Sequence, residues 1–223
     1  SAAMPFTAKA QDKVEASVGA DFVSNYIWRG TDCGGVSIQP SMGVSYKGLS
    51  LTAWGSVGID KEDAREIDLT LGYNTGGFSV SVTDYWFSYR KEDGGYTGDY
   101  FKYGAHSTVH IFEATLGYDF GPLALSWNTY FAGDDYTKEN GDRAYSTYVG
   151  ISAPFKLGGL DWSAEVGLTP WEGAYANKFN VTNLTLKAEK EIKFTNSFSL
   201  PTFAQVTFNP HTQGAYFVFG VSF

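Results

Sequence analysis

Apolar and polar residues alternate with a period of two from Val14 to the end of the chain, and this is its dominant pattern. It is clearest in the last ten residues, where one side would carry Ala215, Phe217, Phe219 and Val221. Such alternation is typical of strands that bury one face, and no segment has convincing amphipathic helical spacing. The pattern therefore predicts an all-β protein.

Twelve segments carry the alternation. They cover residues 13–31, 35–47, 49–60, 66–75, 78–89, 100–120, 123–133, 143–156, 160–171, 179–194, 198–209 and 214–223. Ten or fourteen strands stay open as alternatives, because the two longest segments, 13–31 and 100–120, have room to bend or to be split.

Two kinds of connection alternate strictly along the chain. Tight turns are expected at 47–48, 75–77, 121–122, 157–159 and 195–197, and longer polar loops at 60–65, 90–99, 133–142, 172–178 and 209–213. The first connection, around Asp32–Gly34, takes a loop position. Short turns on one rim and long loops on the other are typical of a membrane-spanning antiparallel up-and-down β-barrel, with periplasmic turns and extracellular loops.

Composition agrees with a barrel in the outer membrane of a Gram-negative bacterium, where the lipid bilayer is the expected partner. Charged residues make up 18% of the chain and aromatic residues 17%, whereas a soluble domain usually has about a quarter charged residues. The mean hydropathy of −0.20 is too polar for a helical membrane protein, and it suits a wall that alternates lipid-facing and lumen-facing residues. The net charge of −8 argues against nucleic acid as a partner.

The single cysteine, Cys33, excludes an internal disulfide and a multi-cysteine metal site. We expect no cofactor and no metal.

The two ends of the chain are read as processing and assembly signals. Residues 1–10 are interpreted as a cloning remnant followed by the tail of a signal peptide, because Ala8-Lys9-Ala10 has the small-x-small pattern of a cleavage site. An ordinary flexible N-terminus is the alternative. Residues 11–223 then form one barrel domain. The aromatic last strand ending in Phe223 resembles the signature that the barrel-assembly machinery recognises.

One segment is more specific than the general pattern. Residues 21–30, with the sequence DFVSNYIWRG, are followed by SMGVSY at 41–46, AWGS at 53–56 and TDYWF at 83–87. These motifs resemble bacterial outer-membrane proteins of unknown function of the TorF or Gcw_chp type. The resemblance covers about the first 90 residues. It implies an exported barrel and a transport role, and it brings no catalytic residues.

The positions that alternate with the apolar set are mostly small and polar, which favours a narrow passive, porin-like channel for small hydrophilic solutes. Acidic residues outnumber basic ones on this face, so cations or neutral solutes would be preferred over anions. The candidate lumen-lining residues are Asp21, Arg29, Trp54, Asp68, Tyr85, Glu113, Asp119, Tyr148, Asp161, Glu165, Lys187, Glu189 and Glu191.

A second reading is a closed structural or accessory barrel that binds another envelope component, with the inward charges paired across strands so that they seal it. An enzyme is not expected. His106, Ser107 and His110 are the nearest candidates for catalysis, but the two histidines would lie ~13 Å apart along a strand.

Two charged residues raise specific expectations. Asp84 falls on the lipid-facing phase of its strand, which is costly at mid-membrane, so a bulge that turns it inward is predicted. Arg29 is expected to point inward and to meet Asp21 or Asp84.

Overall fold

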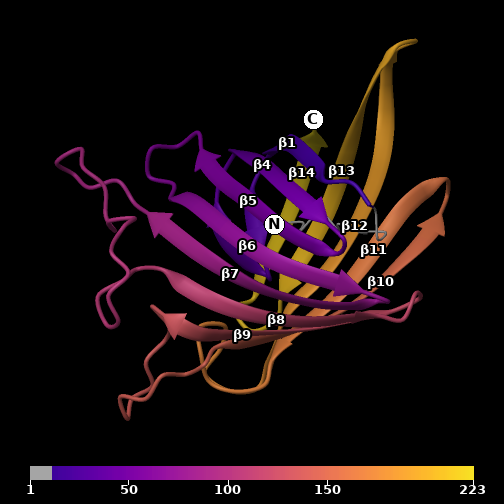
Figure 1. The fold of residues 1–223 in the computed structure, drawn as a ribbon. Helices are drawn as coiled ribbons and strands as arrows, with labels where there is room; N and C mark the ends of the chain where they lie inside the picture. Colours follow the sequence, from indigo (N-terminus) through magenta and orange to yellow (C-terminus); the bar gives the residue numbers. More distant parts are fainter. Residues whose placement is uncertain (1–11) are drawn as a thin grey trace.

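The computed structural model describes residues 12–223, and it confirms a closed antiparallel barrel of twelve strands with no helix (Figure 1). The predicted cloning remnant and signal-peptide tail, 1–10, lie outside the described residues. The wall is built from β1 (Glu15–Val23), β4 (Ser37–Tyr46), β5 (Leu49–Gly58), β6 (Arg65–Thr75), β7 (Phe78–Ser88), β8 (Ile111–Asp119), β9 (Ala124–Gly133), β10 (Thr147–Leu157), β11 (Leu160–Thr169), β12 (Asn180–Thr195), β13 (Phe198–Asn209) and β14 (Gly214–Ser222). Each strand pairs with its chain neighbours, and β1 closes the barrel on β14.

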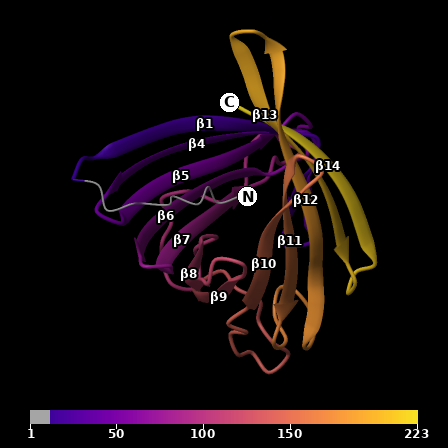
Figure 2. The same ribbon diagram turned by 90° about the vertical axis from the view of Figure 1, so that its right-hand side faces the viewer.

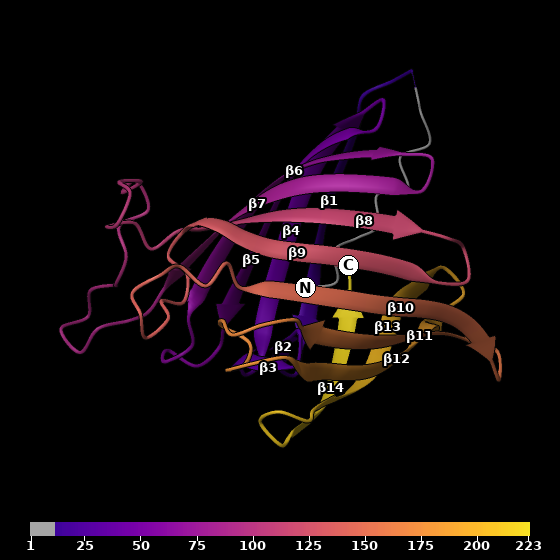
Figure 3. The ribbon, with the colours of Figure 1, turned by 90° about the horizontal axis from the view of Figure 1, so that it is seen from below.

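Tight turns join the strands at one rim, at the five positions where they were predicted. Three of them place two successive residues at positive φ, as at Lys47 (47°) and Gly48 (86°), and at Gly158 (61°) and Gly159 (78°). This is the type I′ geometry, whose twist matches that of the flanking strands. Figure 3 shows the long connections gathered at the opposite end. The hairpin of β12 and β13 extends beyond the rest of the barrel (Figure 2).

The two faces of the wall differ in chemistry as the alternation requires. On β6, Ile67, Leu69 and Leu71 are exposed on the outer surface, whereas Glu66 and Asp68 are buried on the inner one. Inward hydroxyls bond across strands, as between Thr70 and Thr83 Oγ1 at 2.9 Å. Within residues 12–223, no helix is long and apolar enough to cross a membrane.

The predicted strand over 13–31 is wrong in its second half. β1 ends at Val23, which pairs with both Gly220 and Ser37. Ser24 then ends the ladder, because its backbone N–H donates to the Phe219 carbonyl and its hydroxyl accepts from the Phe219 N–H. The chain turns into the barrel and forms a small hairpin from β2 (Tyr26–Trp28) and β3 (Thr31–Gly34). We call residues 25–34 the interior hairpin.

The predicted strand over 100–120 is also too long, since β8 begins only at Ile111. The preceding segment packs on the outer wall instead. Tyr103 of this segment stacks on His110, with ring centroids 4.3 Å apart.

The bulge predicted at Asp84 is wrong. β7 pairs with β6 in continuous register, with Asp84 opposite Leu69, so Asp84 stays on the outer face. Its carboxylate is satisfied there by His110, whose Nδ1 lies 2.6 Å from Oδ1. The hydroxyl of Tyr103 also donates to it. Asp84 therefore stays on the outer face with His110 as its partner, and the predicted bulge that would turn it inward is not needed.

Candidate functional site

The interior hairpin places Arg29 inside the barrel, where its guanidinium meets Glu113 of β8. Nη1 lies 2.6 Å from Oε2 and Nη2 lies 2.9 Å from Oε1, so the pair is bidentate. The Glu113 side chain is 1% exposed and that of Arg29 12%. The expectation that Arg29 points inward is confirmed, but its partner is neither Asp21 nor Asp84. Bidentate pairs fix geometry as well as charge.

Aromatic rings from four further elements surround this ion pair. Arg29 lies over the rings of Trp28 and Tyr148, at 4.4 and 4.7 Å from their centroids. Tyr85 donates to Glu113 Oε1 at 2.9 Å. The Tyr175 oxygen accepts from Arg29 Nη1 at 2.7 Å, and its hydroxyl donates to Tyr130 at 3.2 Å. We call this set the Arg29 cluster; its members are Trp28, Arg29, Tyr85, Glu113, Tyr130, Tyr148 and Tyr175.

Tyr175 belongs to the connection between β11 and β12, and it is buried within the Arg29 cluster. Burial raises the pKa of its phenol to about 12. The phenol is therefore neutral near pH 7, and it can donate to Tyr130 while it accepts from Arg29. The cluster thus joins the hairpin to a second connecting segment as well as to the wall.

The tip of the hairpin is seated against the far wall. Asn209 Nδ2 at the end of β13 donates to the Gly30 carbonyl at 3.0 Å. Gly30 has a φ of +80°, and a Cβ built on it would lie 1.9 Å from the backbone oxygen of Thr182 in β12. Only glycine fits both this conformation and this approach. The hairpin therefore reaches from β1 across the barrel to β12 and β13.

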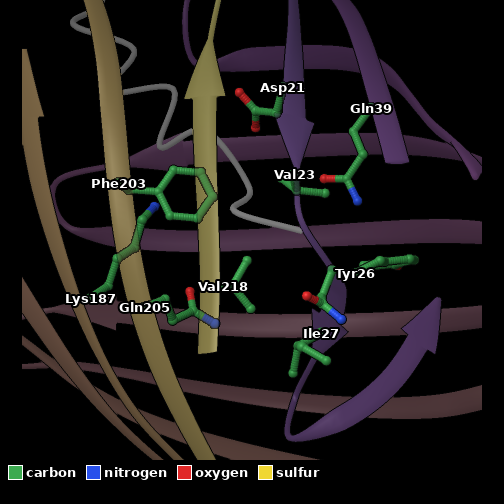
Figure 4. Close-up of a pocket in the computed structure, with 10 residues that line it drawn as sticks. Asp21, Val23, Tyr26, Ile27, Gln39, Lys187, Phe203, Gln205 and Val218 are labelled. Carbon is green, nitrogen blue, oxygen red and sulfur yellow. The ribbon is translucent and has the colours of Figure 1, made fainter. Parts of the chain in front are cut away.

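A small cavity of about 60 Å³ lies between the hairpin and the wall. Figure 4 shows Lys187, Phe203 and Gln205 on one side of it, and Tyr26 and Ile27 of the hairpin on the other. A cavity of this size with polar walls has room for water. It is lined by Asp21, Val23, Asn25, Tyr26, Ile27, Gln39, Lys187, Phe203, Gln205 and Val218.

The candidate lumen residues separate into three groups. Arg29, Tyr85, Glu113 and Tyr148 meet in the Arg29 cluster. Asp21 and Lys187 line the cavity, Trp54 packs on Tyr26 with centroids 5.5 Å apart, and Asp68 is buried on β6. Glu165 accepts from Asn183 Nδ2 at 3.0 Å.

The remaining candidates lie toward the tight turns. Asp161 pairs with Lys156, and Glu189 pairs with Lys187, each at 2.9 Å. Glu191 accepts from Ser199, and Asp119 caps the turn that follows β8 by accepting from the Gly121 N–H. All four acids are exposed, so they do not meet the Arg29 cluster.

Sequence reasoning missed four residues of the site. Trp28 and Gly30 lay within a segment assigned to a strand, Tyr175 lay in an expected loop, and Tyr130 lay in the strand expected over 123–133 but was not among the candidates. The Arg-Gly pair that follows an aromatic run was the only local signal, because glycine often marks a turn or a close approach. The inward turn itself depends on contacts with residues far along the chain.

The seat of Gly30 gives a direct test of the interior hairpin. In Gly30→Ala, the new methyl group would meet the Thr182 carbonyl, so we expect the hairpin to leave its place and the peptide bond after Arg29 to become accessible to trypsin. The measurement is limited trypsin digestion of the folded barrel, with cleavage after Arg29 read by mass spectrometry. We expect at least a tenfold faster cleavage, equivalent to about 1.4 kcal/mol or more of lost protection.

Gly94→Ala is the matched control for this substitution. Gly94 has a φ of +85°, but a Cβ there would meet nothing within 4 Å. The control therefore carries the same backbone strain without the clash. Equal protection of Arg29 in both variants would contradict the seating of the hairpin.

Comparison with known proteins adds no family to this description. No protein-family model matches the chain, and no curated protein matches it. The resemblance to the TorF or Gcw_chp type therefore remains a prediction, and the barrel with its interior hairpin is the basis for inferring function.

Proposed function

We propose that this chain is an outer-membrane barrel with a narrow passage for small neutral or positively charged hydrophilic solutes, and that the interior hairpin gates it. The observation that carries the proposal is the position of the hairpin. It crosses a polar barrel interior and is held there by one ion pair, hydrogen bonds and aromatic contacts. Such contacts can be exchanged for water without breaking the strand ladder.

The outer surface supports the membrane part of the proposal. Large apolar side chains such as Val18, Met42 and Phe217 are between 62% and 86% exposed. Apolar patches of this kind are rare on soluble monomers. Tyr46, Tyr73 and Tyr118 are exposed near the tight turns, where an aromatic girdle would meet the lipid headgroups.

The charge of the interior supports the preference for neutral or positive solutes. Asp21 lies on β1, and Glu66 and Asp68 lie on β6, with β4 and β5 between these two strands, whereas Arg29 is neutralised by Glu113. A lumen with unpaired acids attracts cations and repels anions.

A closed accessory barrel is the second candidate function. The observation in its favour is the burial of the Arg29 cluster, because Tyr85, Glu113, Tyr130 and Tyr148 are each no more than 8% exposed. On this alternative the hairpin is a permanent plug, and the long connections at one rim would bind another envelope component.

Single-channel conductance in a planar bilayer tests both candidates. The natural chain is compared with a variant in which a short Gly-Ser linker replaces residues 25–34. We expect the natural chain to open briefly, and the shortened chain to stay open with at least a fivefold higher mean conductance and cation preference in a salt gradient.

The control is replacement of the exposed residues 91–95 by the same linker, which should leave conductance unchanged. If the natural chain never opens while it migrates as a folded, heat-modifiable barrel, the gated passage is wrong and the accessory barrel replaces it.

A further inference from the structure

Two acidic side chains are buried side by side on the inner face of β6. Glu66 is 4% exposed and Asp68 is 6% exposed. Residues two apart on a strand point to the same face, about 7 Å from each other along the chain. We call them the Glu66–Asp68 pair. Burying a charge is costly unless it is paired, and two like charges at this separation raise the cost.

No basic side chain of the described residues neutralises this pair. Among residues 12–223, none of the ion pairs includes Glu66 or Asp68. Two basic side chains of the barrel interior are engaged elsewhere, since Arg29 binds Glu113 and Lys187 binds Glu189. The Oδ1 atom of Asp68 is buried and has no hydrogen-bond partner. An unpartnered carboxylate oxygen at this depth indicates a missing positive ligand or a proton.

Oxygen atoms and two aromatic rings surround the pair. In the β5–β6 register, Ser56 lies opposite Glu66 and Trp54 lies opposite Asp68. The Ser56 hydroxyl, 2% exposed, accepts from Gln39 Nε2 at 3.5 Å. Tyr26 of the interior hairpin packs on Trp54. Gln39 and Tyr26 also line the neighbouring cavity.

The donor set discriminates between possible ligands. Within the described chain, no three His, Cys, Asp or Glu side chains converge on a metal position. The site instead offers two carboxylates and one hydroxyl, all of which are oxygen ligands. Oxygen ligands suit hard cations such as Ca²⁺. A single divalent ion neutralises both charges, whereas a monovalent ion or one shared proton leaves the pair uncompensated by one charge.

We propose that the Glu66–Asp68 pair binds one divalent cation of the Ca²⁺ type on the inner face of β6. Ser56 and water complete the oxygen ligands. Because Tyr26 covers Trp54 from the hairpin side, the ion would also stabilise the seated hairpin. This inference goes beyond the proposed passage, since a bound ion is required neither to pass through the barrel nor to open it.

Luminescence of Tb³⁺ as a stand-in for Ca²⁺ tests the site directly. Trp54 lies beside Asp68, so excitation of tryptophan should sensitise Tb³⁺ bound there. We expect saturable luminescence with one ion per chain that excess Ca²⁺ displaces. Glu66→Gln and Asp68→Asn should each weaken binding at least tenfold. Glu189→Gln is the matched control, because it removes an exposed acid near the tight turns, and it should bind as tightly as the natural chain.

Thermal unfolding of the natural chain provides a readout without substitutions. We expect a higher midpoint in Ca²⁺ than in EDTA, because a ligand that binds only the folded state stabilises it. The proposal is overturned if Asp68→Asn keeps the displaceable luminescence or if Ca²⁺ leaves the midpoint unchanged. If the unfolding midpoint changes with pH but not with Ca²⁺, Glu66 and Asp68 share a proton and the cation site is wrong. None of these results depends on conductance, so failure of the cation site and failure of the proposed passage are distinguishable.

Discussion

Arg29→Ala should lower the free energy of unfolding by about 3–5 kcal/mol, the largest effect expected for one substitution in this barrel. Glu113 is 1% exposed, so removal of the guanidinium leaves a buried carboxylate with Tyr85 as its remaining donor. Contacts of Arg29 with the rings of Trp28 and Tyr148 are lost as well. Urea denaturation of the folded barrel in lipid vesicles, followed by tryptophan fluorescence, measures the change.

The double variant Arg29→Ala with Glu113→Ala separates the ion pair from simple loss of packing. Because it also removes the stranded carboxylate, we expect it to be more stable than Arg29→Ala alone. Arg90→Ala, an exposed arginine in a long connection, is the matched control and should change stability by less than about 0.5 kcal/mol. A double variant as unstable as the sum of both single variants would contradict a coupled pair.

His110→Ala should lower the free energy of unfolding by about 3 kcal/mol. The effect arises in a different part of the molecule, on the outer wall over β7. His110 is 0% exposed, and its ring nitrogens lie 2.6 Å from Asp84 Oδ1 and 2.7 Å from the Tyr100 carbonyl oxygen. The imidazole therefore lies between a carboxylate and a backbone carbonyl and contacts both. Without the imidazole, Asp84 keeps only Tyr103 on a surface that is otherwise apolar.

The same denaturation measurement checks His110→Ala, and His106→Asn is its control. His106 is exposed and has a φ of +70°, a conformation that asparagine tolerates. We expect the control to stay within about 0.5 kcal/mol of the natural chain. A loss of less than 1 kcal/mol in His110→Ala would mean that the segment before β8 does not protect Asp84.

Local features of the sequence were sufficient to predict the architecture of the barrel. Alternation with a period of two predicted the strand faces and favoured twelve wall strands, because each strand of a closed sheet divides its side chains between two sides. Glycine at turns such as 158–159 gave the tight rim, because type I′ turns need residues that accept positive φ. Both signals depend only on neighbours in the chain.

These local signals did not identify the residues that form the site. Residues 26–28, Tyr-Ile-Trp, are typical of strands, so this segment is compatible with a longer β1 and with a hairpin inside the barrel. Only the candidates Arg29, Tyr85, Glu113 and Tyr148 turned out to share one cluster, and no property of their spacing distinguishes them from Asp119 or Asp161.

The sequence by itself determined an antiparallel barrel with a polar inner and an apolar outer face, and it favoured twelve strands over ten or fourteen. The tertiary structure alone decided that β1 stops at Val23 and that Arg29 meets Glu113, 84 residues along the chain. It also decided that Asp84 stays outside against His110. The physical reason is that strand patterns arise from neighbouring residues, whereas buried charges take whichever partner the closed barrel brings within hydrogen-bonding distance.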